Sequence, residues 1–181
     1  QNDFLIITEK EDPLTLLKKM EIKRIFIICI VASWLQSCDE NRVFDEYKTV
    51  ENRSWSYDSI MKFEFNILDT ISSKNIYINI RNNNEFSFTA INLVSEMYLA
   101  NQIKVIDTLS YKMIDDKGFF LGKGFSQLKE NQLVYKENFS FPSTGIHQIY
   151  LKPVNYTKKI AKSLNSLSGI LDVGVRIEKV N

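Results

Sequence analysis

The chain has 181 residues, 44% of them hydrophobic, and a formal net charge of +1. Because positive charge is neither in excess nor gathered in a long stripe of Lys or Arg, nucleic acid is excluded as a partner. With one histidine and two cysteines in the whole chain, a metal site of clustered His and Cys ligands is excluded as well.

Residues 1–19 contain a short apolar run at positions 4–7, followed by a polar stretch that Pro13 interrupts. We expect this stretch to be an upstream extension without packed structure, with Met20 as the functional start. Residues 1–37 are therefore left out of the predicted fold.

Residues 20–37 have the pattern of a lipoprotein signal peptide. Basic residues at 18–24 precede an apolar run at 25–34, and Leu35-Gln36-Ser37-Cys38 resembles a bacterial lipobox. A membrane-spanning helix needs about 20 apolar residues, and a buried helix rarely follows such a basic stretch. We expect cleavage before Cys38 and lipidation of its thiol, which would attach the chain stably to a membrane through two or more acyl chains. An uncleaved anchor is the alternative.

The exported part of the chain would hold no disulfide, because Cys29 leaves with the signal and Cys38 is lipidated. Its length of about 144 residues suits one domain. We expect apolar burial and sheet hydrogen bonds to stabilise it.

Residues 38–57 are polar and are predicted to form a tether leading into an edge segment, with Trp55 as the first anchor on the core. The domain proper is predicted over 58–181, where apolar and polar residues alternate as in half-buried strands. We predict strands at 61–67, 76–80, 86–99, 103–114, 133–141, 146–152 and 171–177. The phase of the alternation slips near Ala90, which indicates a bulge. A short helical turn is predicted at 126–130, and a short helix or a long loop at 155–168.

Many short strands separated by turn residues are typical of an all-β protein. We therefore predict an antiparallel β-sandwich of about seven to eight strands. An up-and-down β-barrel is the alternative.

The predicted domain contains no recognisable catalytic group. His147 lies alone in a strand, where it is expected to be structural, and no serine lies in a nucleophile elbow. Asp115 and Asp116 are too few to hold calcium, which takes six oxygens or more. We expect no enzymatic activity, no metal and no cofactor.

Three stretches read Asp, hydroxyl residue, aliphatic residue, with Ser59, Thr70 and Thr108 as the hydroxyl residues. The pattern resembles the O-glycosylation acceptor motif of exported Bacteroidetes proteins, so these three are candidate glycosylation sites. The alternative is that each aspartate caps a turn.

Several stretches together resemble the gliding-motility lipoprotein GldH family of the Bacteroidetes. They are found at residues 35–47, 79–85, 122–125, 135–138 and 173–179, and the resemblance spans nearly all of 38–179.

The resemblance implies a lipid-anchored, non-enzymatic accessory component of gliding motility and of the associated type IX secretion apparatus. Its partners would be the membrane, through the lipid at Cys38, and other envelope proteins of that machinery. The implied location is the cell envelope, with the outer membrane favoured. The alternative function is a lipid-anchored carbohydrate- or small-ligand-binding module, since β-sandwiches host many functions.

Overall fold

The computed structural model describes residues 18, 23–24, 41–100, 102–155 and 165–180. The predicted signal peptide, apart from residues 23 and 24, and the predicted lipidation site Cys38 lie outside these ranges. Within the described residues, no helix is both long and apolar enough to span a membrane. Residues 41–181 form a compact unit of their own.

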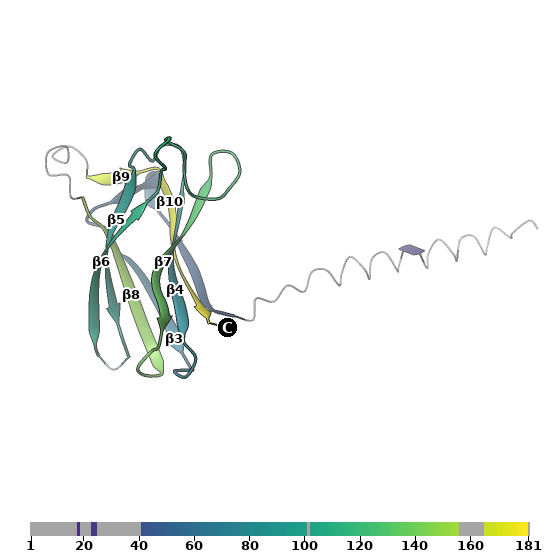
Figure 1. Ribbon diagram of the computed structural model, residues 1–181, viewed down its shortest axis with the longest axis vertical. Coiled ribbons are helices and arrows are strands. Elements are labelled where there is room, and N and C mark those ends of the chain that lie inside the picture. The colour runs from purple at the N-terminus through teal and green to yellow at the C-terminus, as the bar shows by residue number, and fades with distance from the viewer. Residues whose placement is uncertain (1–17, 19–22, 25–40, 101, 156–164, 181) are drawn as a thin grey trace, which may run out of the picture. The chain divides into compact units, whose positions relative to one another are not determined.

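This unit is all-β, with two four-stranded antiparallel sheets (Figure 1). The first sheet contains, in spatial order, β1 (Arg42–Thr49), β10 (Ile170–Lys179), β4 (Lys74–Asn82) and β7 (Lys129–Phe139). The second contains β3 (Met61–Ile67), β8 (Gly145–Pro153), β5 (Ala90–Tyr98) and β6 (Lys104–Lys112). A separate pair joins β2 (Ser54–Ser56) to β9 (Ser166–Ser168), and a 3-10 turn, η1 (Glu51–Arg53), precedes β2.

Alternating side chains build the core between the sheets. In β3 the residues Phe63, Phe65 and Ile67 are buried, while the residues between them are exposed. The two central strands of the first sheet contribute the facing layer, with Ile76, Ile78 and Ile80 on β4 and Val173, Val175 and Ile177 on β10. One apolar face per sheet is what a sandwich requires.

Side chains bridge the open edges of the two sheets. On one side the rings of Phe44 on β1 and Phe65 on β3 lie 5.4 Å apart. On the other side the Tyr111 hydroxyl of β6 donates to the Val134 carbonyl of β7 at 2.7 Å. No backbone ladder among the described strands joins the sheets, so the fold is the predicted sandwich and the barrel alternative is wrong.

Two local predictions were wrong. Strand β5 begins at Ala90 and keeps an unbroken register with β6, so the phase slip marks the start of a strand and not a bulge. Phe86 lies in the preceding loop, where its buried ring joins the core. The helical turn predicted at 126–130 is not helical. Residues 126 and 127 form a turn, and residues 129 and 130 already belong to β7, where Glu130 pairs with Lys123.

The stretch predicted as a tether leading into an edge segment contains regular structure. From Arg42 onward it forms β1, an edge strand paired along its length with β10. Trp55, on β2, is 1% exposed, which confirms it as a core anchor. In the stretch predicted as a helix or loop, the described residues 166–168 form β9, while 156–164 lie outside the described ranges.

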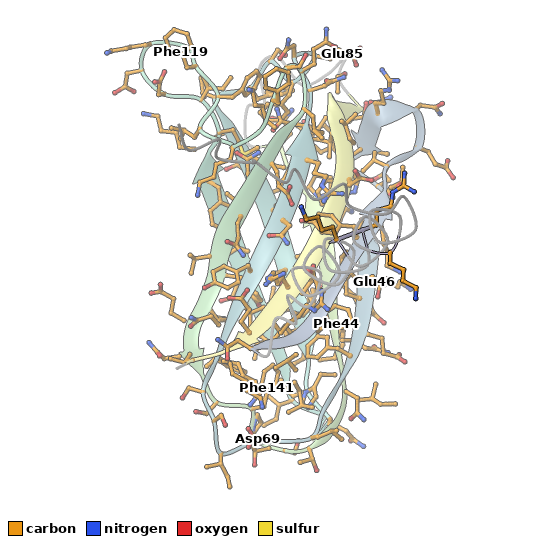
Figure 2. The ribbon with its side chains drawn as sticks, turned by 90° about the vertical axis from the view of Figure 1, so that its right-hand side faces the viewer. Phe44, Glu46, Asp69, Glu85, Phe119 and Phe141 are labelled. Carbon is orange, nitrogen blue, oxygen red and sulfur yellow. The ribbon has the colours of Figure 1, made fainter. Side chains whose placement is uncertain are left out.

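The sandwich has two distinct ends. At the first end, Lys179 N–H donates to the Asn41 carbonyl and Val180 N–H donates to the Ser73 carbonyl. This end, which includes the loop 68–73, we call the proximal end. The opposite end carries the loops 83–89 and 113–128, and we call it the distal end. Figure 2 shows Asp69 at the proximal end and Glu85 and Phe119 at the distal end.

Candidate functional site

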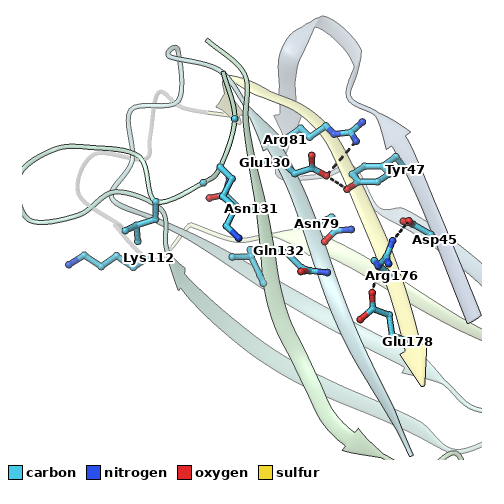
Figure 3. A pocket seen from close by; sticks show the side chains of 15 residues that line it. Asp45, Tyr47, Asn79, Arg81, Lys112, Glu130, Asn131, Gln132, Arg176 and Glu178 are labelled. Carbon is cyan, nitrogen blue, oxygen red and sulfur yellow. Dashed lines mark hydrogen bonds and ion pairs between the residues drawn. The ribbon is translucent and has the colours of Figure 1, made fainter. Parts of the chain in front are cut away.

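A polar pocket of about 860 Å³ lies on the outer face of the first sheet. Its walls come from β1, β4, β7 and β10 and from the loop segment 121–124, which borders it toward the distal end (Figure 3). Lys112 at the end of β6 also lines it, so the pocket is assembled from six separate stretches of the chain.

The strand register defines the floor of the pocket. Tyr47, Gly174, Asn79 and Gln132 are register partners in one row across β1, β10, β4 and β7. Because side chains alternate between the two faces of a strand, all four lie on the face opposite the apolar core.

Gly174 lets the Tyr47 ring lie flat against the sheet. A Cβ atom at Gly174 would come within 2.8 Å of Tyr47 Cδ1. The ring extends across this gap so that its hydroxyl donates to Glu130 Oε1. The Arg81 guanidinium lies 4.0 Å from the ring centroid and also contacts Glu130, at 3.4 Å. Burial, followed by the hydrogen bond to Glu130, raises the pKa of Tyr47 above its ordinary value, so the hydroxyl stays a donor.

A second charged group lies on the other side of the floor. Arg176 Nη1 contacts Asp45 Oδ2 at 2.8 Å, and its Nε donates to Glu178 Oε1 at 2.5 Å. Figure 3 shows Asn79 and Gln132 between this group and the one around Arg81. A ligand on the floor would thus lie between two sets of paired charges.

Asn79 supplies a buried hydrogen-bond acceptor at the floor of the pocket. The residue is only 3% exposed, and its Oδ1 atom accepts no hydrogen bond from the described part of the chain. A buried amide oxygen without a donor is costly, and such atoms are few in native proteins. A donor group that reached this buried atom would satisfy it.

The loop 113–128 forms the distal rim of the pocket. Lys123 and Glu130 exchange two backbone hydrogen bonds, of 2.9 and 2.7 Å, which attach this loop to the edge of β7. Four large apolar residues of the loop are exposed, among them Phe119 at 68% and Phe125 at 93%; the others are Leu121 and Leu128. We call these four the apolar rim. Several exposed apolar residues on one loop beside a pocket are a candidate interaction surface.

The candidate site residues from the sequence do not meet in this pocket. Cys38 lies outside the described residues. Ser59 lies between β2 and β3, Thr70 lies between β3 and β4, and Thr108 is exposed on β6. Asp69 Oδ1 accepts from Ile71 N–H at 2.8 Å, as expected for an aspartate that caps a turn. Glycosylation of the three hydroxyl residues stays a prediction.

His147 has a structural environment. It is fully buried, its Nδ1 accepts from Ala100 N–H at 3.2 Å, and its Nε2 lies 3.1 Å from the Ser143 carbonyl. Both ring nitrogens are thus occupied by backbone groups. Among the described residues, no three His, Cys, Asp or Glu side chains are grouped so that they could hold a metal ion.

The pocket was not predicted from the sequence, although residues 79–85, 122–125 and 173–179, which resemble the family, contribute to it. One signal was present: Gly174 lies inside a strand in which apolar and charged residues otherwise alternate, and a glycine inside a strand often marks a close approach of another group. The identity of that group, Tyr47, depends on the pairing of β1 with β10, which the sequence analysis did not predict.

The chain matches known proteins along most of its length. The model of the family described as GldH lipoprotein matches residues 42–177. The gliding motility lipoprotein GldH of Flavobacterium johnsoniae is 36% identical over 160 residues, which cover 88% of this chain and 99% of that protein. A gliding motility lipoprotein GldH homolog of Christiangramia forsetii is 35% identical over 155 residues, which cover 86% of this chain and 94% of that protein.

Solved structures show only distant likenesses. Infectious bursal disease virus VP2 in a subviral particle aligns with 79% of this chain, at 16% identity and a TM-score of 0.37. The T13 particle of the same virus aligns with 78% of this chain, at 14% identity and a TM-score of 0.35. This chain spans about a third of either viral chain, 33% and 32% respectively, and neither likeness bears on function.

Proposed function

The chain belongs to the GldH lipoprotein family, and from this membership we propose that it is a membrane-anchored, non-enzymatic accessory component of gliding motility. In this proposal it serves the associated type IX secretion apparatus by binding or stabilising other envelope proteins. The lipid at Cys38 holds it to the cell envelope, at the outer membrane.

The observation that supports the binding role is the Asn79 Oδ1 atom, which has no hydrogen-bond donor in the described part of the chain and lies in a pocket bordered by the apolar rim. Together they match a partner protein that inserts a polar segment into the pocket and covers Phe119 and Phe125 with apolar side chains. Aromatic residues supply much of the energy of protein interfaces, and a polar neighbourhood around them is common.

The residues also support a non-enzymatic role. Both cysteines of the chain lie at or before position 38, and both nitrogens of the single histidine, His147, are occupied by backbone groups. General acid–base or nucleophilic catalysis most often relies on such side chains placed within reach of a substrate.

The test is a pull-down of the tagged full chain from cross-linked, detergent-solubilised envelopes. We expect gliding-motility or secretion lipoproteins to be recovered with the wild type and to be lost with the Phe119→Ser/Phe125→Ser double variant. Ile106→Ser, which removes a comparably exposed apolar side chain from β6, is the matched control and should recover the partners. Equal recovery with all three chains would refute binding through the apolar rim.

A Cys38→Ala chain tests the anchor in the same experiment. We expect it to leave the membrane fraction and to recover fewer partners. A Cys38→Ala chain that fractionates with membranes as the wild type does would contradict lipid anchoring at this residue.

A second candidate function is a small-ligand- or carbohydrate-binding module. The pocket volume of about 860 Å³ and the orphaned Asn79 Oδ1 favour it. Against a sugar ligand, the Tyr47 ring already contacts Gly174 and the Arg81 guanidinium, so it offers no free stacking platform. A glycan array together with a thermal-shift screen discriminates: a hit that is lost in Asn79→Leu would favour this function over partner binding.

A further inference from the structure

The loop 68–73 at the proximal end exposes two aliphatic side chains. Leu68 is 82% exposed and Ile71 is 94% exposed, whereas the residue just before the loop, Ile67, is fully buried. Single exposed apolar residues are ordinary, so the meaning of this pair depends on how the loop is built and where it lies.

The loop is held by a dense set of hydrogen bonds. The Asp69 carboxylate accepts from Ile71 N–H at 2.8 Å and from the Ser72 hydroxyl at 2.5 Å. Lys74, only 1% exposed, donates from Nζ to the carbonyls of Asp69 at 2.6 Å and Ser72 at 2.7 Å. The fold thus places a buried lysine where it fixes the loop that presents Leu68 and Ile71 to the surroundings.

The loop carries no unbalanced charge. Its one carboxylate, Asp69, lies 3.6 Å from Lys74 Nζ. The hydrogen bonds from the Ser72 side chain and from the backbone of Ile71 and Ser72 hold the pKa of Asp69 below its usual range. A neutral loop tip with two protruding aliphatic side chains is suited to an apolar medium.

The length of the chain limits how far the predicted lipid at Cys38 can lie from the loop. Asn41, just before β1, lies in one row with Lys179 on β10 and Lys74 on β4. Neighbouring strands are about 4.8 Å apart, so Lys74 lies about 10 Å from Asn41. Two residues lie between Cys38 and Asn41, so the three Cα–Cα steps that join them allow a reach of about 10 Å. The acyl chains and the loop are therefore restricted to the same side of the domain.

We propose that the loop 68–73 is a second membrane contact, in which Leu68 and Ile71 enter the surface of the bilayer that holds the acyl chains of Cys38. The inference rests on the lipid anchoring in the proposed function and goes beyond it. Two contacts fix the domain with its proximal end on the bilayer, so that the apolar rim and the pocket opening beside it are held away from the lipid. Insertion of apolar side chains into the interface adds to membrane affinity.

The test uses the full chain, processed and lipidated in a bacterial host, and reconstituted into phosphatidylcholine–phosphatidylglycerol vesicles. Once Cys29 is removed and Cys38 is acylated, no free thiol remains, so one cysteine can be introduced and labelled with an environment-sensitive fluorophore. The label is placed at Ile71→Cys or, as the matched control at the distal end, at Phe119→Cys.

We expect the label at Ile71→Cys to emit at shorter wavelength in vesicles and to be quenched by lipids brominated near the headgroup. The label at Phe119→Cys should show neither effect. Adding Leu68→Ser to Ile71→Cys should reduce the shift, while the thermal unfolding temperature stays the same because both side chains are exposed.

Three results would overturn the contact. If the chain floats with the vesicles and the label at Ile71→Cys is as water-exposed as that at Phe119→Cys, the anchor stands and only the contact is wrong. If the label at Ile71→Cys is protected from water in intact envelopes but not in vesicles, the loop contacts a partner protein and not the lipid. A saccharide found on Thr70 would keep the loop in water. A chain that does not float and whose Cys38 has an unmodified mass would refute the lipid anchor itself.

Discussion

The ring of Tyr47 on β1 packs against the bare Cα of Gly174 on β10, where a Cβ atom would come within 2.8 Å of the ring. Through this contact the Tyr47 hydroxyl reaches Glu130, so side chains from the two edge strands of the first sheet, β1 and β7, are hydrogen bonded to each other. One glycine therefore determines both the flat floor of the pocket and a link across the whole sheet.

Gly174→Ala should destabilise the domain by about 1–3 kcal/mol, because the added methyl group overlaps the Tyr47 ring and also lies 2.9 Å from the Glu46 carbonyl oxygen. Tyr47→Phe, which keeps the ring and removes only the hydroxyl, should cost about 1 kcal/mol. Denaturant unfolding of the two variants measures the difference. Wild-type stability for Gly174→Ala would contradict the close packing.

The sequence predicted the sandwich because its core strands follow a period of two. The prediction for 61–67 coincides with β3, and those for 76–80 and 171–177 lie within β4 and β10. For the stretch that contains β1 the sequence predicted only a tether leading into an edge segment, because an edge strand need not alternate: Phe44 and Lys48 are both half-buried, and no continuous apolar face forms. The shape of such a strand is determined by its neighbour, β10, and not by its own pattern.

The pocket could not be predicted from the sequence for a related reason. Asn79 lies among isoleucines in an alternating strand, and alternation alone predicts that it is exposed to solvent. It is 3% exposed, on a central strand between β10 and β7 and in a pocket lined by residues of several strands. Which residues these are depends on register, and a shift of one residue would exchange the two faces of a strand.

His147 should make the domain less stable in mild acid. Burial lowers the pKa of its imidazole below the ordinary value of about 6.5. The unfolded chain then binds the proton more readily, so the free energy of unfolding falls as the pH drops below about 6.5 and levels off below the folded pKa. Denaturant unfolding between pH 8 and about pH 5 measures this fall.

His147→Gln is the control for this effect, since it keeps a donor and an acceptor but does not titrate. We expect its stability to be lower at neutral pH and nearly constant across the same range. An equally steep fall in His147→Gln would assign the pH dependence to another group.

Glycosylation is predicted for at least one of Ser59, Thr70 and Thr108. Thr108 is the most accessible of the three, exposed on the edge strand β6, whereas Ser59 and Thr70 are half-buried. The intact mass of the lipoprotein made in a Bacteroidetes host should contain hexose-sized additions, and Thr108→Ala should remove one of them. A mass that equals the polypeptide plus its acyl chains would reject the motif in this protein.

Lys74→Met should destabilise the domain by about 2–4 kcal/mol, because it leaves the carbonyls of Asp69 and Ser72 without their donor and removes the partner of the Asp69 carboxylate. Lys129→Met is the matched control. Lys129 also donates to a backbone carbonyl, that of Gly124 at 3.2 Å, but in an exposed position, so its loss should change stability by less than about 0.5 kcal/mol. Denaturant midpoints that shift equally in both variants would show that Lys74 has no special role.

The contribution of Asp69 to the stability of the loop 68–73 should be lost in acid. Its pKa lies below the usual range because the Ser72 hydroxyl and the backbone N–H groups of Ile71 and Ser72 donate to the carboxylate. A carboxyl group of this kind stabilises the fold above its unfolded pKa of about 3.9, and the stabilisation is lost as the pH falls toward the folded pKa. The free energy of unfolding of the wild type should therefore exceed that of Asp69→Asn at pH 6, and the two curves should converge below about pH 4. Curves that run parallel down to pH 2 would mean that the Asp69 carboxylate contributes nothing to the loop, and the loop's rigidity would then depend on Lys74 alone.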